Sequence, residues 1–272
     1  MGIEWNISAG DGADWPGDWH AALAALAWQA DLGVTEAVGD VPVNRYDLPA
    51  AVLPAARAAM VPDPALPAPF AAEAPVLRQA AAVDAAGALA GRAQTLDDLR
   101  AAMAGYDQCD LKRGARNLVF AGGQVGAAVL ILTDPPNRED DVEGQPFAGQ
   151  PGQLLDRMLA AIGLDRGGVY IVPALPWRPP ADRAPEAGEL AMMRPFVDRH
   201  IALAAPRVMV TMGTVALRML TGQAGLSRLR GQWLAAGAVP LLPMLHPADL
   251  IRNPAAKREA WADLLAVKAR LG

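Results

Sequence analysis

A polar loop between a short apolar run and an amphipathic helix is the feature that most constrains this chain. The run AVLIL (Ala128 to Leu132) has the length and composition of a buried parallel strand, and the loop TDPPNREDDVEGQPFAG follows it directly. In open α/β sheets, ligand sites lie at the carboxyl ends of the strands. A second polar loop, LHPADLIR (Leu245 to Arg252), follows the apolar run VPLLPM. We therefore expect the two loops to meet over one crevice, with the geometry of a pocket for a small molecule or a flipped base.

From residue 106 onward, apolar runs alternate with helical patterns. This alternation predicts an α/β fold in which a parallel sheet is covered by helices on both faces. The predicted strands are 129–132, 169–172, 208–212 and 239–244, and the predicted helices lie near 152–162, 185–204, 214–220 and 255–271.

Residues 1–105 have a different character, and we place a domain boundary between residues 105 and 106. Helical spacing predicts a helix from Asp18 to Gly33, and recurrent prolines from Pro42 to Pro75 predict a linker or strap. Two further helical patterns follow, in VLRQAAAVDAAGALAGRA and in TLDDLRAAMAGY. Thr95 with Asp98 three residues later resembles a capping box at the start of the second pattern. The region 1–105 is therefore predicted to be an Ala/Pro-rich, mostly helical segment.

Composition excludes several classes of protein. Cys109 is the single cysteine and there are three histidines, which excludes an internal disulfide and argues against a metal site. No apolar run is long enough to cross a bilayer, and the acidic opening is unlike a secretory signal, so we expect a cytoplasmic protein.

The net charge of −5 is unevenly distributed along the chain. Acidic residues outnumber basic ones in residues 1–105, and basic residues outnumber acidic ones in 106–272. Arginines in the loops of the second part can contact phosphates with two parallel N–H donors, although a solvated surface is the more common explanation for any single arginine. These arginines are Arg178, Arg183, Arg228, Arg230 and Arg252.

Several motifs in series, from about residue 106 to 270, resemble those of the uracil-DNA glycosylase superfamily, and family 4 in particular. The resemblance implies a three-layer α/β/α sandwich with a four-stranded parallel sheet. It also implies a monomeric DNA glycosylase that flips uracil, or another deaminated base, out of DNA. The motifs are CDLKRGARNLVFAGG, EGQPFAGQPGQLLDRML, VYIVPALPWRPPADR, RPFVDRHIALAAPRVMVTMG, LSRLRGQW and LHPADLIRNPAAKREAWADLL.

The resemblance assigns catalytic roles to two residues. Asp134 takes the position of the acid that stabilises the sugar cation or positions water, and His246 that of the imidazole that stabilises the departing base anion. Without the resemblance, Asp134 is equally well explained as an Asx turn before Pro135, and a lone histidine is more often structural.

Other positions are expected to bind the base and the DNA. Phe147 matches the aromatic residue that stacks on the extruded base; the alternative is a core phenylalanine, but the flanking glycines favour exposure. The stretch from Leu226 to Trp233 matches the loop that inserts into DNA. Within it and in the HP motif, the residues expected to contact DNA are Arg228, Leu229, Arg230, Pro247 and Arg252.

The chain departs from the family at three positions of the expected pocket. Pro135 has no backbone N–H where family members offer one, and Pro173 stands where they carry the Asn that reads the uracil edge. Asn137 replaces a glycine, a change that can force the loop out of a positive-φ conformation. Pro135, Phe147 and Pro173 are therefore expected to line a base pocket that discriminates poorly.

The iron–sulfur cluster of family 4 is not expected here. Cys109 matches one ligand, but Tyr106, Trp177 and Met193 stand at the other three positions, and one thiolate cannot hold a cubane. We expect apolar packing to fill the space, with no metal and no cofactor.

Two functions of different classes remain open. The first is a monofunctional DNA glycosylase, since the motifs contain no lysine nucleophile for a lyase step. The second is a pseudo-glycosylase that keeps a DNA-binding or partner-binding surface after its pocket has decayed. A nucleotide-binding doubly wound domain is a weaker interpretation, because neither GxGxxG nor GxxxxGK[ST] follows a strand.

Overall fold

The computed structural model describes the backbone of residues 75–272. The predicted helix from Asp18 to Gly33 and the proline-rich stretch that precedes residue 75 lie outside the described residues. The predicted strands and helices from residue 106 onward all lie inside them.

The described chain is built around one mixed sheet of six strands in the order β1-β3-β2-β4-β6-β5. The four central strands are mutually parallel, as predicted, and three of them, 129–133, 169–173 and 208–212, are buried along their whole length. The four central strands are β2 (Val129–Thr133), β3 (Val169–Pro173), β4 (Val208–Met212) and β6 (Val239–Met244).

Two short edge strands were not predicted. β1 (Gly122–Gly123) pairs antiparallel with β3, and β5 (Leu234–Ala236) pairs antiparallel with β6. Strands of two or three residues are too short to show an alternating pattern. β1 needs glycine for a steric reason: Gly123 has φ +78°, and a Cβ on it would lie 2.1 Å from the carbonyl oxygen of Val169.

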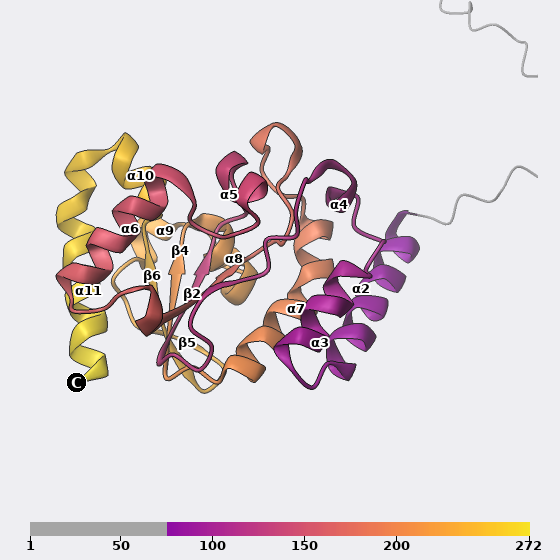
Figure 1. Ribbon diagram of the computed structural model, residues 1–272, viewed down its shortest axis with the longest axis horizontal. Coiled ribbons are helices and arrows are strands. Elements are labelled where there is room, and N and C mark those ends of the chain that lie inside the picture. The colour runs from indigo at the N-terminus through magenta and orange to yellow at the C-terminus, as the bar shows by residue number, and fades with distance from the viewer. Residues whose placement is uncertain (1–74) are drawn as a thin grey trace, which may run out of the picture. The chain divides into compact units, whose positions relative to one another are not determined.

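Helices cover both faces of the sheet, which gives the three layers that the resemblance implied (Figure 1). One core lies between the sheet and the first group of helices, which are α2 (Pro75–Arg92), α3 (Leu96–Ala104), α7 (Ala187–Ala204) and α8 (Thr214–Thr221). The other core lies against α6 (Gly149–Ala161), α10 (Pro247–Arg252) and α11 (Lys257–Leu271). Side chains of β2 alternate between the two cores, with Leu130 in the first and Ile131 in the second.

Helices α2 and α3, which precede the predicted boundary at residue 105, pack on α7. Ala86, Leu99 and Met103 share a buried core with Phe196 of α7. The capping box expected at Thr95 is present: its hydroxyl accepts from the Asp98 amide at 3.1 Å, and its amide donates to the Asp98 carboxylate at 3.0 Å. The helical character predicted for residues 75–104 is thus confirmed, whereas the domain boundary stays a prediction.

Short helices complete the connections. They are α4 (Leu111–Gly114), α5 (Arg138–Glu143), α9 (Leu226–Leu229) and three 3-10 turns, Arg166–Gly168, Pro180–Asp182 and Pro254–Ala256. In the part of the chain that the structure describes, no helix combines the length and apolarity needed to span a lipid bilayer.

Candidate functional site

The loops singled out in the sequence gather at the carboxyl ends of the parallel strands. Asp134 follows β2, Pro173 is the last residue of β3, and His246 follows β6. The hydrogen bonding between β2 and β4 continues one residue beyond β2, because the Asp134 amide donates to the Met212 carbonyl at 3.1 Å. The position of Asp134 is therefore fixed by the sheet itself.

The Asp134 carboxylate binds the amino-terminal end of α8. Its Oδ1 accepts from the backbone amides of Val215 at 2.9 Å and Ala216 at 3.0 Å. Gly213 makes room for this contact, since a Cβ there would lie 2.2 Å from the carboxylate. The alternative interpretation, an Asx turn before Pro135, does not describe this arrangement, because these hydrogen bonds go to α8.

Burial raises the pKa of Asp134 to about 6. The α8 amides oppose this shift by stabilising the charged form, while the nearby Asp249 carboxylate adds to it. Asp134 is consequently a carboxylate at neutral pH that becomes protonated in mildly acidic solution.

His246 begins α10 as its N-cap residue. Its Nδ1 accepts from the Ala248 amide at 3.1 Å, so the neutral ring carries its proton on Nε2. Burial lowers the pKa of His246 to about 4; Asp249 opposes the shift and Arg252 adds to it. At neutral pH the side chain is an uncharged hydrogen-bond donor. The sheet brings the two loops together: Gly213, which lies against the Asp134 carboxylate, donates its amide at 3.1 Å to the carbonyl of Met244, two residues before His246.

Phe147 stacks on His246. The ring centroids are 5.1 Å apart and the ring planes are 17° from parallel. Phe147 is only 4% exposed, so the exposed presentation expected from its flanking glycines is wrong: the ring packs on the imidazole and in the core beside α6. Its φ of 57° is left-handed, which costs a non-glycine residue about 1–2 kcal/mol.

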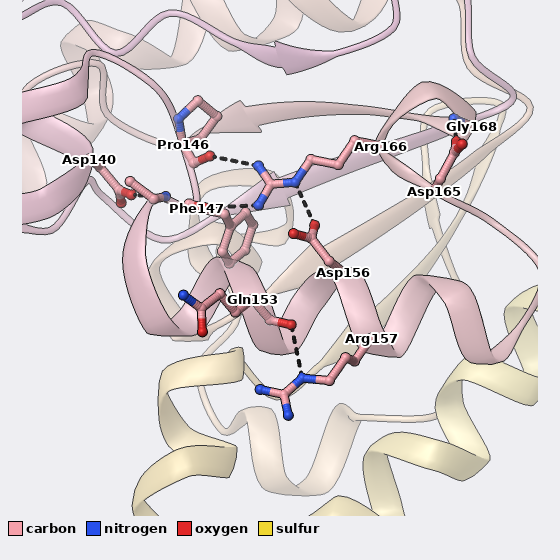
Figure 2. A network of polar contacts seen from close by, with 10 residues as sticks. Asp140, Pro146, Phe147, Gln153, Asp156, Arg157, Asp165, Arg166 and Gly168 are labelled. Atoms are coloured by element: carbon pink, nitrogen blue, oxygen red, sulfur yellow. Dashed lines mark hydrogen bonds and ion pairs between the residues drawn. The ribbon is translucent and has the colours of Figure 1, made fainter.

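Several groups that hold Phe147 were not singled out in the sequence. Arg166 donates to its carbonyl at 2.9 Å, and Asp140 accepts from the following amide, that of Ala148, at 2.7 Å (Figure 2). An N-x-x-D capping pattern was available for Asp140, whose partner is Asn137. No local pattern marks Arg166.

Asn137 does not strain the loop in the way that its replacement of glycine suggested. Its φ is −85°, and its side chain caps α5 by accepting from the Asp140 amide at 2.9 Å. The change from glycine is therefore absorbed by a helix cap.

The part of the site at the end of β3 is apolar. Pro173 is buried and pairs in register with Thr133 of β2, and its ring nitrogen has no proton to donate. The next amide, that of Ala174, donates to the Thr133 carbonyl at 2.8 Å. The chain then stays buried as far as Trp177. Pro135 is half-buried at the start of the neighbouring loop.

The loop expected to insert into DNA forms the short helix α9. Arg228 is exposed and Leu229 is half-buried. Arg230, by contrast, is 18% exposed and uses its guanidinium within the protein: Nη2 lies 2.7 Å and Nε 3.1 Å from the two carboxylate oxygens of the buried Asp263, and Glu259 is also paired with it. This arrangement fastens the loop to α11.

The remaining residues expected at DNA lie on α10. Pro247 is buried as the first residue of that helix, and Arg252 is exposed and paired with Asp249. The loop arginines Arg178 and Arg183 form forks with carboxylates instead, those of Asp182 and Glu189. The contacts predicted for DNA stay predictions.

The fold and these loops define an α/β protein with a candidate site at the carboxyl ends of its parallel strands. A family model described as the Uracil DNA glycosylase superfamily matches residues 120–265. The chain belongs to this superfamily.

Curated relatives named Type-4 uracil-DNA glycosylase share about three tenths of the residues. The protein from Pyrobaculum aerophilum is 30% identical over 167 residues, which cover 58% of this chain and 85% of the relative. The protein from Archaeoglobus fulgidus is 30% identical over 181 residues, covering 62% and 90%. The protein from Thermotoga maritima is 31% identical over 150 residues, covering 53% and 77%.

The four positions expected to match the iron–sulfur ligands of family 4 lie together in one buried core. Cys109, Tyr106, Trp177 and Met193 belong to the same apolar cluster, where the Tyr106 hydroxyl donates to the Ala82 carbonyl at 2.8 Å. Burial raises the pKa of the Cys109 thiol to about 11, so it is not a thiolate. A phenol, an indole, a thioether and a protonated thiol do not fit a cubane, which needs thiolate ligands.

Proposed function

We propose that the chain is a monofunctional DNA glycosylase, acting as a monomer, that hydrolyses the N-glycosidic bond of uracil or another deaminated base flipped out of DNA. The observation that carries the proposal is the stacking of Phe147 on a neutral His246 at the carboxyl ends of the sheet. Membership of the superfamily and the names of the relatives support the reaction class.

Phe147 and His246 supply the contacts to the base. Stacking of a base on an aromatic ring contributes about 1–3 kcal/mol. Because the two rings are in contact, a base enters when one ring rotates aside, and Nε2–H of His246 then donates to a carbonyl oxygen of the base. A neutral imidazole N–H suits this role, because it stabilises the negative charge that develops on the base through a hydrogen bond, and no proton has to leave the ring.

Asp134 supplies the negative charge. As the bond from C1′ to the base nitrogen breaks, its electron pair leaves with the base and positive charge develops on the sugar. The Asp134 carboxylate, held by the α8 amides, stabilises that cation or orients the water that adds to C1′. The products are a free base and an abasic site.

DNA docking is assigned to the surface around α9 and α10. Exposed Arg228 and Arg252 are proposed to contact phosphates, Leu229 to wedge between bases, and Pro247 to shape the approach to His246. Arg230 was also predicted to contact DNA; its pairing with Asp263 supports an indirect role, in which it holds the loop in place.

Pro173 and Pro135 favour a second candidate, a pseudo-glycosylase that binds DNA or a protein partner without excising a base. Neither residue offers a backbone donor to the base edge, and a pocket without directional hydrogen bonds rejects wrong bases weakly. The same feature, in an active enzyme, predicts that hypoxanthine or xanthine is accepted beside uracil.

Base excision from defined oligonucleotides tests the proposal. The protein is incubated with duplex and single-stranded DNA containing one uracil, hypoxanthine or xanthine, and abasic sites are then cleaved with alkali. We expect cleavage at one or more of the three bases and none in undamaged DNA. DNA binding without an abasic product from any substrate would favour the pseudo-glycosylase.

A further inference from the structure

Phe147 is held by its backbone as well as by its ring. A left-handed φ is unfavourable for phenylalanine, so the residue keeps this conformation only if its neighbours stabilise it. The carbonyls of Pro146 and Phe147 and the amide of Ala148 are all hydrogen-bonded, and the side chains that bind them come from separate elements.

Arg166 binds the two carbonyls that lead into and out of the turn. Its Nη2 donates to the Phe147 carbonyl at 2.9 Å, and its Nη1 lies 3.3 Å from the Pro146 carbonyl (Figure 2). The third donor, Nε, bonds to the Asp156 carboxylate of α6 at 2.6 Å. The guanidinium is therefore fixed by α6 and spans two consecutive peptide groups, which a lysine cannot do.

Two further features keep the Phe147 carbonyl turned toward Arg166. A Cβ on Gly152 would lie 1.8 Å from that carbonyl oxygen, so α6 can approach only because residue 152 is glycine. On the far side, Asp140 accepts from the Ala148 amide at 2.7 Å. The peptide between Phe147 and Ala148 is thus bound at its oxygen by Arg166 and at its nitrogen by Asp140.

We propose that Arg166 is a positioning residue, which fixes the left-handed turn and so presents the Phe147 ring to His246 and to the base. The proposal deepens the glycosylase function and rests on it for its catalytic consequence. Without the guanidinium, the carbonyls of Pro146 and Phe147 both lose their donor, and only the Asp140 bond to the Ala148 amide remains. The peptide between Pro146 and Phe147 can then rotate, φ of Phe147 relaxes to a negative value, and the ring leaves the imidazole. The ring can still turn about its own side-chain bonds to admit a base, because only its backbone is fixed.

The position of the ring can be measured without any enzymatic activity. The chain contains four phenylalanines, so uniform labelling with para-fluorophenylalanine gives a fluorine NMR spectrum in which Phe147→Leu identifies the Phe147 resonance. We expect Arg166→Ala to shift and broaden that resonance alone, with partial recovery when methylguanidinium enters through the pocket of about 380 Å³ that residue 166 lines and takes the place of the guanidinium. Arg166→Lys should behave like the alanine variant.

A matched control follows Asp156 directly in the sequence. Arg157, on α6, also binds a backbone carbonyl, but its partner is Gln153 of the same helix, at 3.2 Å, rather than a residue of the Phe147 turn (Figure 2). Arg157→Ala should leave the Phe147 resonance in place. If Arg166→Ala does not fold, Asp156→Asn, which loosens the guanidinium and removes no atom from the turn, should give a smaller shift in the same direction.

Excision kinetics supply the second readout. A misplaced stacking ring should lower kcat by up to about 10²-fold while affinity for undamaged DNA stays unchanged. An unshifted Phe147 resonance in Arg166→Ala would overturn the proposal, whatever the wild type does to uracil. If the resonance moves but the wild type excises no base, positioning is supported and the glycosylase function fails, so the two failures are distinct.

Discussion

The two sides of the candidate site are built differently. The side formed by the loops after β2 and β6 carries a half-buried carboxylate, a neutral imidazole and a stacked ring, each held by hydrogen bonds that involve the backbone. The side formed at the end of β3 consists of Pro173 and a buried apolar segment. In the proposed function, the first side stacks on the base and stabilises charge, and the second side holds the position expected to read the uracil edge, so that one side can change without the other.

The largest expected effect is on the first side. His246→Ala removes the Nε2–H donor and should lower the single-turnover excision rate by about 10²–10³-fold. His246→Asn keeps an N-cap and a donor amide, so its loss should be smaller. Equal excision rates for His246→Ala and the wild type would contradict the comparison, because the side formed by the loops after β2 and β6 would then contribute nothing to excision.

Asp134 should make excision pH-dependent. Its pKa of about 6 in the folded protein means that the required carboxylate is lost as pH falls, so the rate should drop roughly tenfold between pH 7.5 and 5. Asp134→Asn should excise the base about 10²-fold more slowly at pH 7.5, and its rate should no longer fall between pH 7.5 and 5. A wild-type rate that stays flat from pH 7.5 to 5 would contradict the role.

Asp134→Asn should also raise the stability of the fold at alkaline pH, although it slows excision. A folded pKa raised above 3.8 means that Asp134 stabilises the fold in its protonated form and loses that contribution as pH rises through about 6. Asn keeps an oxygen for the α8 amides and carries no charge. Asp134→Asn should therefore raise the midpoint of urea unfolding at pH 8 but not at pH 4; equal midpoints at pH 8 would contradict the burial argument.

On the second side, the end of β3, a substitution should increase uracil excision. Pro173→Asn restores an amide at the end of β3 and should raise uracil excision about tenfold relative to hypoxanthine, the worth of one or two directional hydrogen bonds. The ratio of the two rates measured in parallel is the readout. An unchanged ratio would show that Pro173 does not limit base reading.

The smallest effect is expected in the core that contains Cys109. Tyr106→Phe removes the bond to the Ala82 carbonyl and should lower the free energy of unfolding by about 1 kcal/mol, with no change in excision. The purified protein should also be colourless and free of iron by elemental analysis. A brown preparation would contradict the expectation of no cluster, and loss of excision in Tyr106→Phe would mean that this core takes part in the reaction.

The fold was largely predictable because its central strands are buried on both faces and form continuous apolar runs in the sequence. β2 and β4 are examples, whereas β1 and β5 are too short to leave a pattern. The loop positions of Asp134, Phe147 and His246 followed from the motifs.

The contacts within the site could not be predicted in the same way. Binding of Asp134 to α8, pairing of Arg230 with Asp263 and the fork of Arg166 all join residues far apart along the chain. The burial of Phe147 was missed for the same reason, since its glycine neighbours are local and its stacking partner, His246, is not.

A double-mutant cycle between Phe147 and His246 tests the central claim most directly. Single-turnover uracil excision is measured for the wild type, Phe147→Leu, His246→Ala and the double variant. If the ring and the imidazole act on one flipped base, their effects are coupled, and the double variant should be far less impaired than the product of the two single losses. Losses that simply multiply, or a wild type that releases no base, would contradict the account.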